Sequence, residues 1–235
     1  MSGREVMETL ARNREAGDGS AQGQTYWSPV IDNEEATLEV ELPAGMSPDA
    51  AQFAIPQVSH LISSPVDTRV LQEKIGQSAS CNLDAMCYTG TWGNESLAVA
   101  RMIYTSGASS YLCTGTLLND LASTSTPYFL SANHCVDTQT VASTLQTYWF
   151  YRSTSCNSGV LSGNTQTVTG GAALLYANVG SDTSFMKLNN APPGGAWLAG
   201  WTTSVAALSA AVTGLHNPAG DLQKISFASI AGYAS

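Results

Sequence analysis

The run at residues 127–135, which reads PYFLSANHC, limits what this chain can fold into more than any other stretch. It opens with aromatic and aliphatic residues around Phe129, the composition of a buried strand. Small residues follow, and then His134 and Cys135. Such a segment buries its strand and presents an imidazole at the strand end, beside a thiol that can anchor it. His134 is then either a buried histidine that hydrogen-bonds to the backbone or a group placed to move protons.

The cysteines are confined to one part of the chain, because all five lie after residue 80. They are Cys81, Cys87, Cys113, Cys135 and Cys156. None belongs to a C-x-x-C pair, and the two histidines of this region do not stand at zinc-finger spacing, so structural zinc is not expected. Disulfides formed in an oxidising compartment are the better interpretation.

The two parts of the chain also differ in charge. Residues 1–75 carry 12 Asp+Glu and 5 Lys+Arg, whereas residues 76–235 carry 6 and 4 and are rich in Ser, Thr, Ala and Gly. The second composition is typical of a secreted β-protein with short strands and many turns. A net charge of −9 without a basic stripe argues against nucleic-acid binding. The sequence has no run of about 18 apolar residues, so no membrane span is predicted.

The N-terminal part predicts a short helix followed by strands. Residues 3–14 have an amphipathic pattern, and the glycine-rich residues 17–24 end it. Strand-like runs follow at residues 25–31, 36–42 and 51–63, and the middle run alternates cleanly between apolar and polar residues. Since three strands do not easily bury a core alone, we expect the tail of a larger β-domain.

The change in composition places a boundary in the polar stretch that follows. We predict a partial β-rich segment at residues 1–64, a linker at 65–80 and a main domain at 81–235. Lys74 precedes an apolar residue and a glycine, the pattern of a cleavage point in a zymogen, although a lone lysine also suits a plain linker. Our hypothesis is that processing occurs near Lys74.

The main domain has short apolar runs at close spacing, which predicts an all-β fold of antiparallel strands. Five runs suit a closed six-stranded barrel: residues 97–106, 109–119, 127–135, 145–153 and 170–180. Four more runs start a second set that stops short at Ser235: residues 184–190, 197–203, 211–218 and 223–230.

Four segments together resemble the trypsin-like serine peptidases, and most closely the bacterial lysyl endopeptidases. They are CTGTLLN at 113–119, SANHC at 131–135, TYWFYRSTSC at 147–156 and SDTSFMKLNN at 181–190. The resemblance runs in order from about residue 75 to residue 235. It implies a double antiparallel barrel whose second barrel is truncated, and a preceding pro-region. For residues 1–64 the alternative to a pro-region is a solvated accessory module.

The same resemblance implies how the cysteines pair. Cys113 would bond to Cys135, and Cys87 would bond to Cys156. In the resembling proteins the partner of Cys81 lies in a later part of the peptidase, so Cys81 is expected to have no partner in this chain.

The resemblance also implies two catalytic residues. His134 would take the proton of the nucleophile and pass it to the leaving amine, and Asp182 would fix the tautomer of the ring. A turn cap before a strand is the alternative role for Asp182, and Asp137 is expected to lie on the surface. The family order is His, Asp, Ser, but only 53 residues follow Asp182 and no G-x-S-G string occurs. We therefore expect the nucleophilic serine beyond the end of this chain, and no turnover from this polypeptide alone.

Three further residues match the family near its substrate cleft. His216 matches a histidine-proline turn, for which we expect a structural or subsite role. Trp197 and Trp201 match an aromatic pair, although core packing is the alternative for at least one of them.

These observations lead to one main hypothesis and one alternative. The first is a fragment of a secreted serine endopeptidase, with a protein or peptide substrate and its own pro-region as partners. The alternative is a non-catalytic peptidase homologue that acts as a secreted binding or adhesion module. No cofactor or metal is implied. Residues 1–13 have mixed charges and no apolar core of an export signal, so we expect the true start of the protein to lie upstream.

Overall fold

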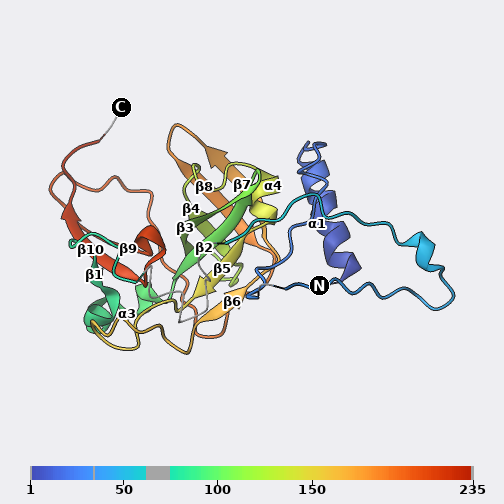
Figure 1. The fold of residues 1–235 in the computed structure, drawn as a ribbon. Coiled ribbons are helices and arrows are strands. Elements are labelled where there is room, and N and C mark those ends of the chain that lie inside the picture. The colour runs from blue at the N-terminus through green and yellow to red at the C-terminus, as the bar shows by residue number, and fades with distance from the viewer. Residues whose placement is uncertain (1, 34, 62–74, 234–235) are drawn as a thin grey trace.

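The computed structural model describes residues 2–33, 35–61 and 75–233, and these form two antiparallel sheets (Figure 1). The larger sheet has the strand order β6-β5-β2-β3-β4-β8-β7, and the smaller sheet has the order β1-β10-β9. The strands of the larger sheet are β2 (Val99–Ser106), β3 (Ser109–Leu118), β4 (Tyr128–Ser131), β5 (Gln146–Trp149), β6 (Gln166–Val168), β7 (Ala172–Asn178) and β8 (Thr183–Leu188). Those of the smaller sheet are β1 (Leu83–Asp84), β9 (Ala211–His216) and β10 (Lys224–Ser229).

The β2–β3 hairpin is the centre of the larger sheet. Its strands pair from Val99↔Thr116 to Ser106↔Ser109, and β2 is buried along nearly its whole length. Gly107 occupies the turn at φ +62°, a conformation that glycine adopts without steric cost. The core of the sheet is filled by large apolar side chains that are fully buried. They include Met102, Leu117, Phe129, Leu145, Trp149 and Met186.

The larger sheet corrects two expectations about the barrels. No pairing is found between the described end strands β6 and β7, so hydrogen bonds do not close the sheet into the expected six-stranded barrel. The run at 184–190, which we assigned to a second set, forms β8 and lies between β4 and β7 in the larger sheet. Pairing with β4 and β7 places it there, and its buried residues Ser184, Met186 and Leu188 then face inward and complete the larger core.

The smaller sheet consists of β9 and β10 with a short contribution from β1. Six residue pairs join β9 to β10, and β1 adds Leu83↔Ile225 to the other side of β10. The run at 197–203 was expected to be a strand, but it makes one isolated bridge, Leu118↔Ala199. This bridge, with the hydrogen bonds from Ala199 N to Leu117 O and from Asn119 N to Ala199 O, ties the run to the end of β3.

Among the residues that the structure describes, helices are few and short, with one exception at the N-terminus. That helix, α1 (Gly3–Glu15), confirms the amphipathic pattern, and a capping box between Ser2 and Glu5 starts it. The others are α3 (Thr89–Ser96), α4 (Gln139–Ser143), and the 3₁₀ turns η1 (Pro48–Ala50), η2 (Ala85–Tyr88) and η3 (Pro218–Gly220). Within the described ranges, no helix combines the length and the apolar character needed to cross a membrane.

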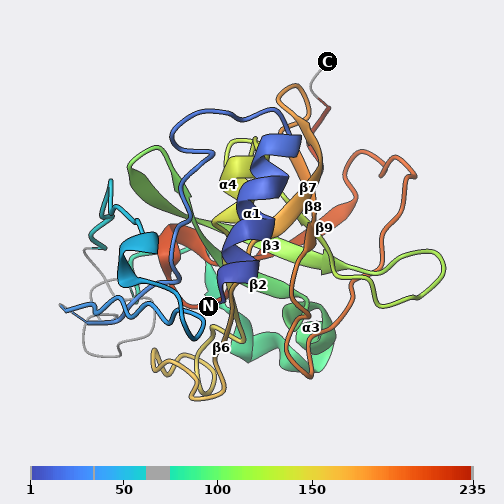
Figure 2. The same ribbon diagram turned by 90° about the vertical axis from the view of Figure 1, so that its right-hand side faces the viewer.

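The three strands expected in the N-terminal part are wrong for the residues that the structure describes. Residues 25–33 and 35–61 run as irregular chain with one 3₁₀ turn, and they wrap past α1 and the edge of the larger sheet (Figure 2). The alternating run shows why, since Leu38 and Val40 remain 46% and 47% exposed. Alternation makes a strand only where a partner strand accepts its hydrogen bonds and a core covers its apolar face.

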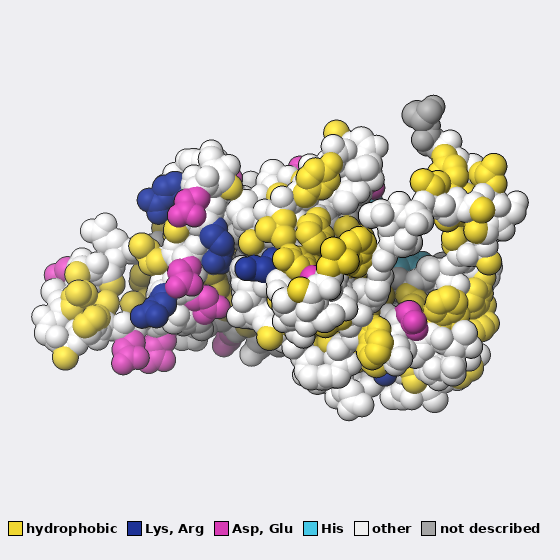
Figure 3. Space-filling model, turned by 180° about the vertical axis from the view of Figure 1, so that it is seen from behind, with side chains coloured by type: hydrophobic (Ala, Val, Ile, Leu, Met, Phe, Trp, Pro, Cys, Tyr) yellow, Lys and Arg dark blue, Asp and Glu magenta, His cyan; other side chains and the backbone are white. Residues whose placement is uncertain are grey.

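The charged side chains of the molecule are unevenly distributed. Seen from behind, Lys, Arg, Asp and Glu gather over α1 and the neighbouring N-terminal chain, while the sheets present mostly hydrophobic and neutral side chains (Figure 3). The difference in composition between the two parts of the sequence is therefore also a difference between two regions of the surface.

Candidate active site

His134 lies in a tight turn directly after β4. The strand ends at Ser131, and the N–H groups of Cys135 and Val136 both donate to the carbonyl of Ala132, at 3.1 and 3.2 Å. This turn directs the imidazole out of the sheet, and the side chain of His134 is 70% exposed. It is thus not the buried structural histidine that was the alternative in the sequence.

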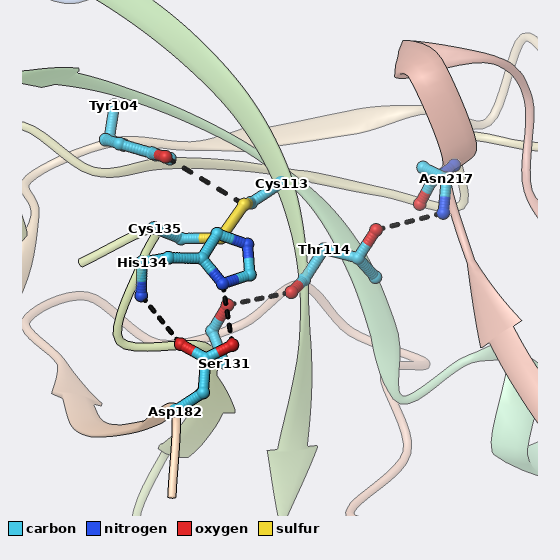
Figure 4. The surroundings of a disulfide bond; sticks show 8 residues. All are labelled: Tyr104, Cys113, Thr114, Ser131, His134, Cys135, Asp182 and Asn217. Carbon is cyan, nitrogen blue, oxygen red and sulfur yellow. Dashed lines mark hydrogen bonds and ion pairs between the residues drawn. A yellow bond between two sulfur atoms is a disulfide. The ribbon is translucent and has the colours of Figure 1, made fainter. Parts of the chain in front are cut away.

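Asp182 meets His134 because β4 and β8 are neighbours. The pairing Ser131↔Ser184 brings the end of β4 beside the start of β8, although the two residues are 48 positions apart. The carboxylate Oδ2 lies 2.7 Å from His134 Nδ1, and Oδ1 accepts the main-chain N–H of His134 at 2.9 Å (Figure 4). Asp182 itself has φ +47°, and its carbonyl accepts the N–H of Asn133 at 3.1 Å.

The contacts with His134 favour the ionised form of the Asp182 carboxyl group. They lower its pKa, first through the hydrogen bond from the His134 main chain and then through the bond to the ring. An ionised carboxylate accepts a hydrogen bond from Nδ1–H, so a neutral imidazole beside it carries its hydrogen on Nδ1 and has a lone pair on Nε2. Asp182 therefore orients the imidazole of His134 through Nδ1, and the ring itself is exposed to solvent and can act as a base.

Both disulfides pair the cysteines that the resemblance implied. Cys113–Cys135 joins β3 to the residue after His134, and Cys87–Cys156 joins η2 to the loop after β5. Cys81 is exposed and has a free thiol. The sulfur atoms of Cys113 and Cys135 also lie within 4.8 Å of a ring nitrogen of His134. They are bonded to each other, so they do not offer the thiolates that a zinc site requires.

Thr114 links the turn of His134 to the smaller sheet. Its carbonyl accepts the hydroxyl of Ser131 at 2.8 Å, and its own hydroxyl accepts the N–H of Asn217 at 2.9 Å (Figure 4). Asn217 follows His216 at the end of β9, is nearly fully buried, and donates from Nδ2 to the carbonyl oxygens of Tyr151 and Asp221. This link was not predicted, because nothing in the local sequence pattern around Thr114 or Asn217 signals a contact between sheets.

The aromatic and histidine residues expected near a cleft lie at the surface or partly buried. Trp197 and Trp201 are 45% and 49% exposed, and Trp201 Nε1 donates to the carbonyl of Asn119 at 2.8 Å. His216 is partly buried, and this burial lowers the pKa of its imidazole. Asp137 is exposed.

The sequence matches two domain models that cover nearly the whole chain. Residues 75–235 match the C-terminal domain of lysyl endopeptidase, and residues 1–62 match its N-terminal domain. A curated lysyl endopeptidase from Pseudomonas aeruginosa is 36% identical over 233 residues, which are 96% of this chain and 49% of the relative. The chain thus spans about half the length of that relative.

The similarity to solved structures is weaker. Two structures of the HtrA-type protease AlgW with a tripeptide match with TM-scores of 0.41 and 0.39 and 17% identity. Each match covers 62% of this chain and 40% of the AlgW chain. The domain matches are the stronger finding, and they show that this chain belongs to the lysyl endopeptidase family.

Proposed function

We propose that this chain is part of a secreted serine endopeptidase that hydrolyses peptide bonds by a Ser-His-Asp mechanism. The observation that carries the proposal is the pair of contacts between Asp182 and His134, with Nδ1 held and Nε2 free. The nucleophilic serine would lie beyond residue 235. A preference for lysine beside the cleaved bond is supported by the name of the family alone.

In the proposed mechanism the two residues have separate tasks. His134 Nε2 accepts the hydroxyl proton as the serine oxygen attacks the scissile carbonyl, and it then gives that proton to the leaving amine. Asp182 keeps Nδ1 protonated and stabilises the imidazolium that forms between these two steps. The exposure of the ring, at 70%, leaves room for a nucleophile and a substrate to reach Nε2.

The proposal includes the organisation of the chain. Residues 1–64 would be a pro-region, residues 65–80 a linker, and residues 81–235 the part of the peptidase domain present here. Two disulfides in a chain of this kind support export to an oxidising compartment. Processing near Lys74 remains our hypothesis, and this residue lies outside those that the structure describes. N-terminal sequencing of the secreted protein would show whether the new end lies there.

The experiment that tests the function begins with the reading frame beyond the codon for Ser235. We expect it to continue into a G-x-S-G segment and a further cysteine that pairs with Cys81. The protein encoded by the whole frame would then be assayed on peptide amides, together with His134→Ala and Asp182→Asn. We expect Asp182→Asn to lose about 10⁴-fold in kcat and His134→Ala about 10⁶-fold. Asp137→Asn serves as the matched control, since Asp137 is exposed and close in sequence to His134.

Two results would contradict the proposal. Full turnover in His134→Ala would show that another group is the base. A stop codon directly after Ser235 would leave no nucleophile, and it would support the alternative of a non-catalytic homologue that binds proteins.

A further inference from the structure

Two cysteines and a histidine come together beside the end of β4. The sulfur atoms of Cys113 and Cys135 and a ring nitrogen of His134 all lie within 4.8 Å of one another (Figure 4). Among the residues that the structure describes, this is the one group of three or more His, Cys, Asp or Glu side chains placed to share a metal ion. In the oxidised chain the two sulfurs are bonded to each other, so the group offers only the imidazole as a ligand.

Reduction of this disulfide changes what the group can bind. It gives two thiols, and a thiol that binds a metal releases its proton and coordinates as thiolate. In a tetrahedral zinc site, sulfur and nitrogen ligands bound at about 2.3 and 2.0 Å stand about 3.5–3.8 Å apart. The Cα atoms of Cys113 and Cys135 are 6.4 Å apart, so rotation of the side chains brings the separated sulfurs to that distance.

The backbone positions of the three residues do not depend on the disulfide alone. Cys113 lies within β3 and pairs with Met102 in the central hairpin of the larger sheet. His134 and Cys135 share the tight turn after β4, which is closed by hydrogen bonds to the carbonyl of Ala132. Because β3 and β4 are neighbours in the sheet, we expect the three side chains to stay together after reduction.

The contacts around the group are those that metal ligands commonly have. A histidine bound to a metal usually donates its other ring N–H to a carboxylate or a carbonyl, which fixes the orientation of the ring. His134 has this partner already, since its Nδ1 lies 2.7 Å from Asp182 Oδ2 and the lone pair is on Nε2. The hydroxyl of Tyr104 lies 3.9 Å from Cys113 Sγ, where it can donate to a thiolate.

The ligand types select the metal. Two thiolates and one imidazole with an open fourth position, which water fills, are a known ligand set for zinc in enzymes. Mg²⁺ and Ca²⁺ prefer oxygen ligands, so they do not suit this group.

We propose that the dithiol form of this chain binds one Zn²⁺ through Cys113, Cys135 and Nε2 of His134, and that formation of the disulfide releases the metal. The chain is synthesised in this form. Oxidation by a disulfide compound transfers two electrons from the two thiolates to the S–S bond of that compound, forms the Cys113–Cys135 bond and frees Zn²⁺. Only one consequence rests on the proposed function, namely that His134 cannot act as a base while Nε2 holds the metal.

The experiment uses the full chain with Cys81→Ala, which removes the exposed free thiol. A phosphine reduces the disulfides: it supplies two electrons per S–S bond and takes an oxygen atom from water, whose protons go to the thiols. The chain is then freed of phosphine and titrated with Co²⁺ without oxygen. We expect one Co²⁺ per chain, with the absorption of tetrahedral cobalt bound to thiolate, and displacement of Co²⁺ by Zn²⁺. The oxidised chain should show neither.

Variants identify the ligands. Cys113→Ser should lose part of the thiolate absorption, and Cys87→Ser is its matched control, because neither change breaks a disulfide in the reduced chain. Asp182→Asn should weaken Zn²⁺ binding about 10–100-fold through the orientation of the ring. Asp137→Asn, its control, should leave the affinity unchanged, since Asp137 is exposed.

Thermal unfolding shows whether the fold holds the metal. At a free Zn²⁺ concentration about a hundredfold above Kd, the Tm of the reduced chain should rise by about 5–10 °C. Cobalt spectra without thiolate absorption, equal spectra for Cys113→Ser and Cys87→Ser, or an unchanged Tm would each overturn the site. So would a reduced chain that loses its near-UV circular dichroism and does not regain it with Zn²⁺. None of these readouts requires turnover, so they separate this proposal from the catalytic one.

Discussion

Asp182 contacts His134 through both of its carboxylate oxygens, one on the ring and one on the main chain. The ring nitrogen Nδ1 lies 2.7 Å from Oδ2, and the main-chain N–H lies 2.9 Å from Oδ1. The two bonds together fix the imidazole and the turn that bears it, so the ring cannot rotate without also losing its partner. This pairing depends on the register of β4 and β8, where Ser131 faces Ser184.

The first prediction concerns the titration of Asp182. Its carboxyl group should titrate below its ordinary pKa of about 3.9 in the folded chain. The main-chain bond is the larger cause of the lowered pKa, and it survives when the ring is removed. In His134→Ala the pKa of Asp182 should therefore rise only part of the way to the ordinary value. Carbon-13 NMR of the carboxyl group measures this directly.

The same contacts also determine the direction in which the free energy of unfolding changes with pH. Because the folded pKa is lowered, its contribution to the free energy of unfolding is complete above about pH 4 and is lost as the pH falls through the folded pKa. Asp182→Asn should lack this part of the acid dependence. A titration of Asp182 at or above the ordinary pKa would contradict the double contact.

The second prediction concerns the disulfides, which close loops of different length. The sequence separations are 22 for Cys113–Cys135 and 69 for Cys87–Cys156. On the loop-entropy model, removing them should lower the free energy of unfolding by about 3 and about 4 kcal/mol respectively. Urea unfolding of the two double Cys→Ala variants measures both values. Cys81→Ala is the control, and it should change stability by no more than about 0.5 kcal/mol because Cys81 is exposed and unpaired.

The sequence predicted most of the larger sheet, because its strands carry their own signals. β2, β3 and β4 each combine apolar or β-branched residues with turn residues at their ends, and all three form near the predicted positions. The resemblance supplied both cysteine pairs and the two residues of the candidate site, and the structure brings His134 and Asp182 together.

The features that were predicted wrongly or not at all share one physical cause. Each depends on partners that lie far away in the sequence. Residues 36–42 alternate as a strand does, but the structure gives them no strand to pair with, and Leu38 stays half exposed. β8 has the same kind of pattern as β9, so only the neighbouring strands β4 and β7 decide to which sheet it belongs. The bond between Thr114 and Asn217 spans 103 residues and has no local signature at all.

The third prediction concerns Gly115, which lies in β3 against the ring of Phe129. A Cβ atom at this position would lie 2.2 Å from Phe129 Cε1 and 2.5 Å from Cζ. Phe129 is fully buried, so its ring has little room to move away. We expect Gly115→Ala to lower the free energy of unfolding by about 1–3 kcal/mol.

Two variants check this explanation by chemical denaturation. Gly163→Ala should change the free energy of unfolding by no more than the ordinary difference between glycine and alanine, since no atom lies within 4 Å of a Cβ there. The double variant Gly115→Ala/Phe129→Leu should lose less free energy of unfolding than the sum of the losses in the two single variants, because the smaller side chain relieves the overlap. Strict additivity would contradict steric contact as the cause.

The last prediction concerns Tyr148, whose ring is 2% exposed. Burial raises the pKa of its hydroxyl to about 12, and the Arg101 guanidinium, 5.7 Å from the ring centre, opposes part of this rise. The folded chain therefore keeps a proton that the unfolded chain releases near pH 10. The free energy of unfolding should be unaffected by this group below about pH 10, and it should fall between pH 10 and 12 by at most about 1.4 kcal/mol per pH unit. Tyr148→Phe should flatten this part of the profile in urea titrations, whereas Tyr176→Phe should not, since Tyr176 is 52% exposed. An equal loss in wild type and Tyr148→Phe would assign the alkaline instability to other groups.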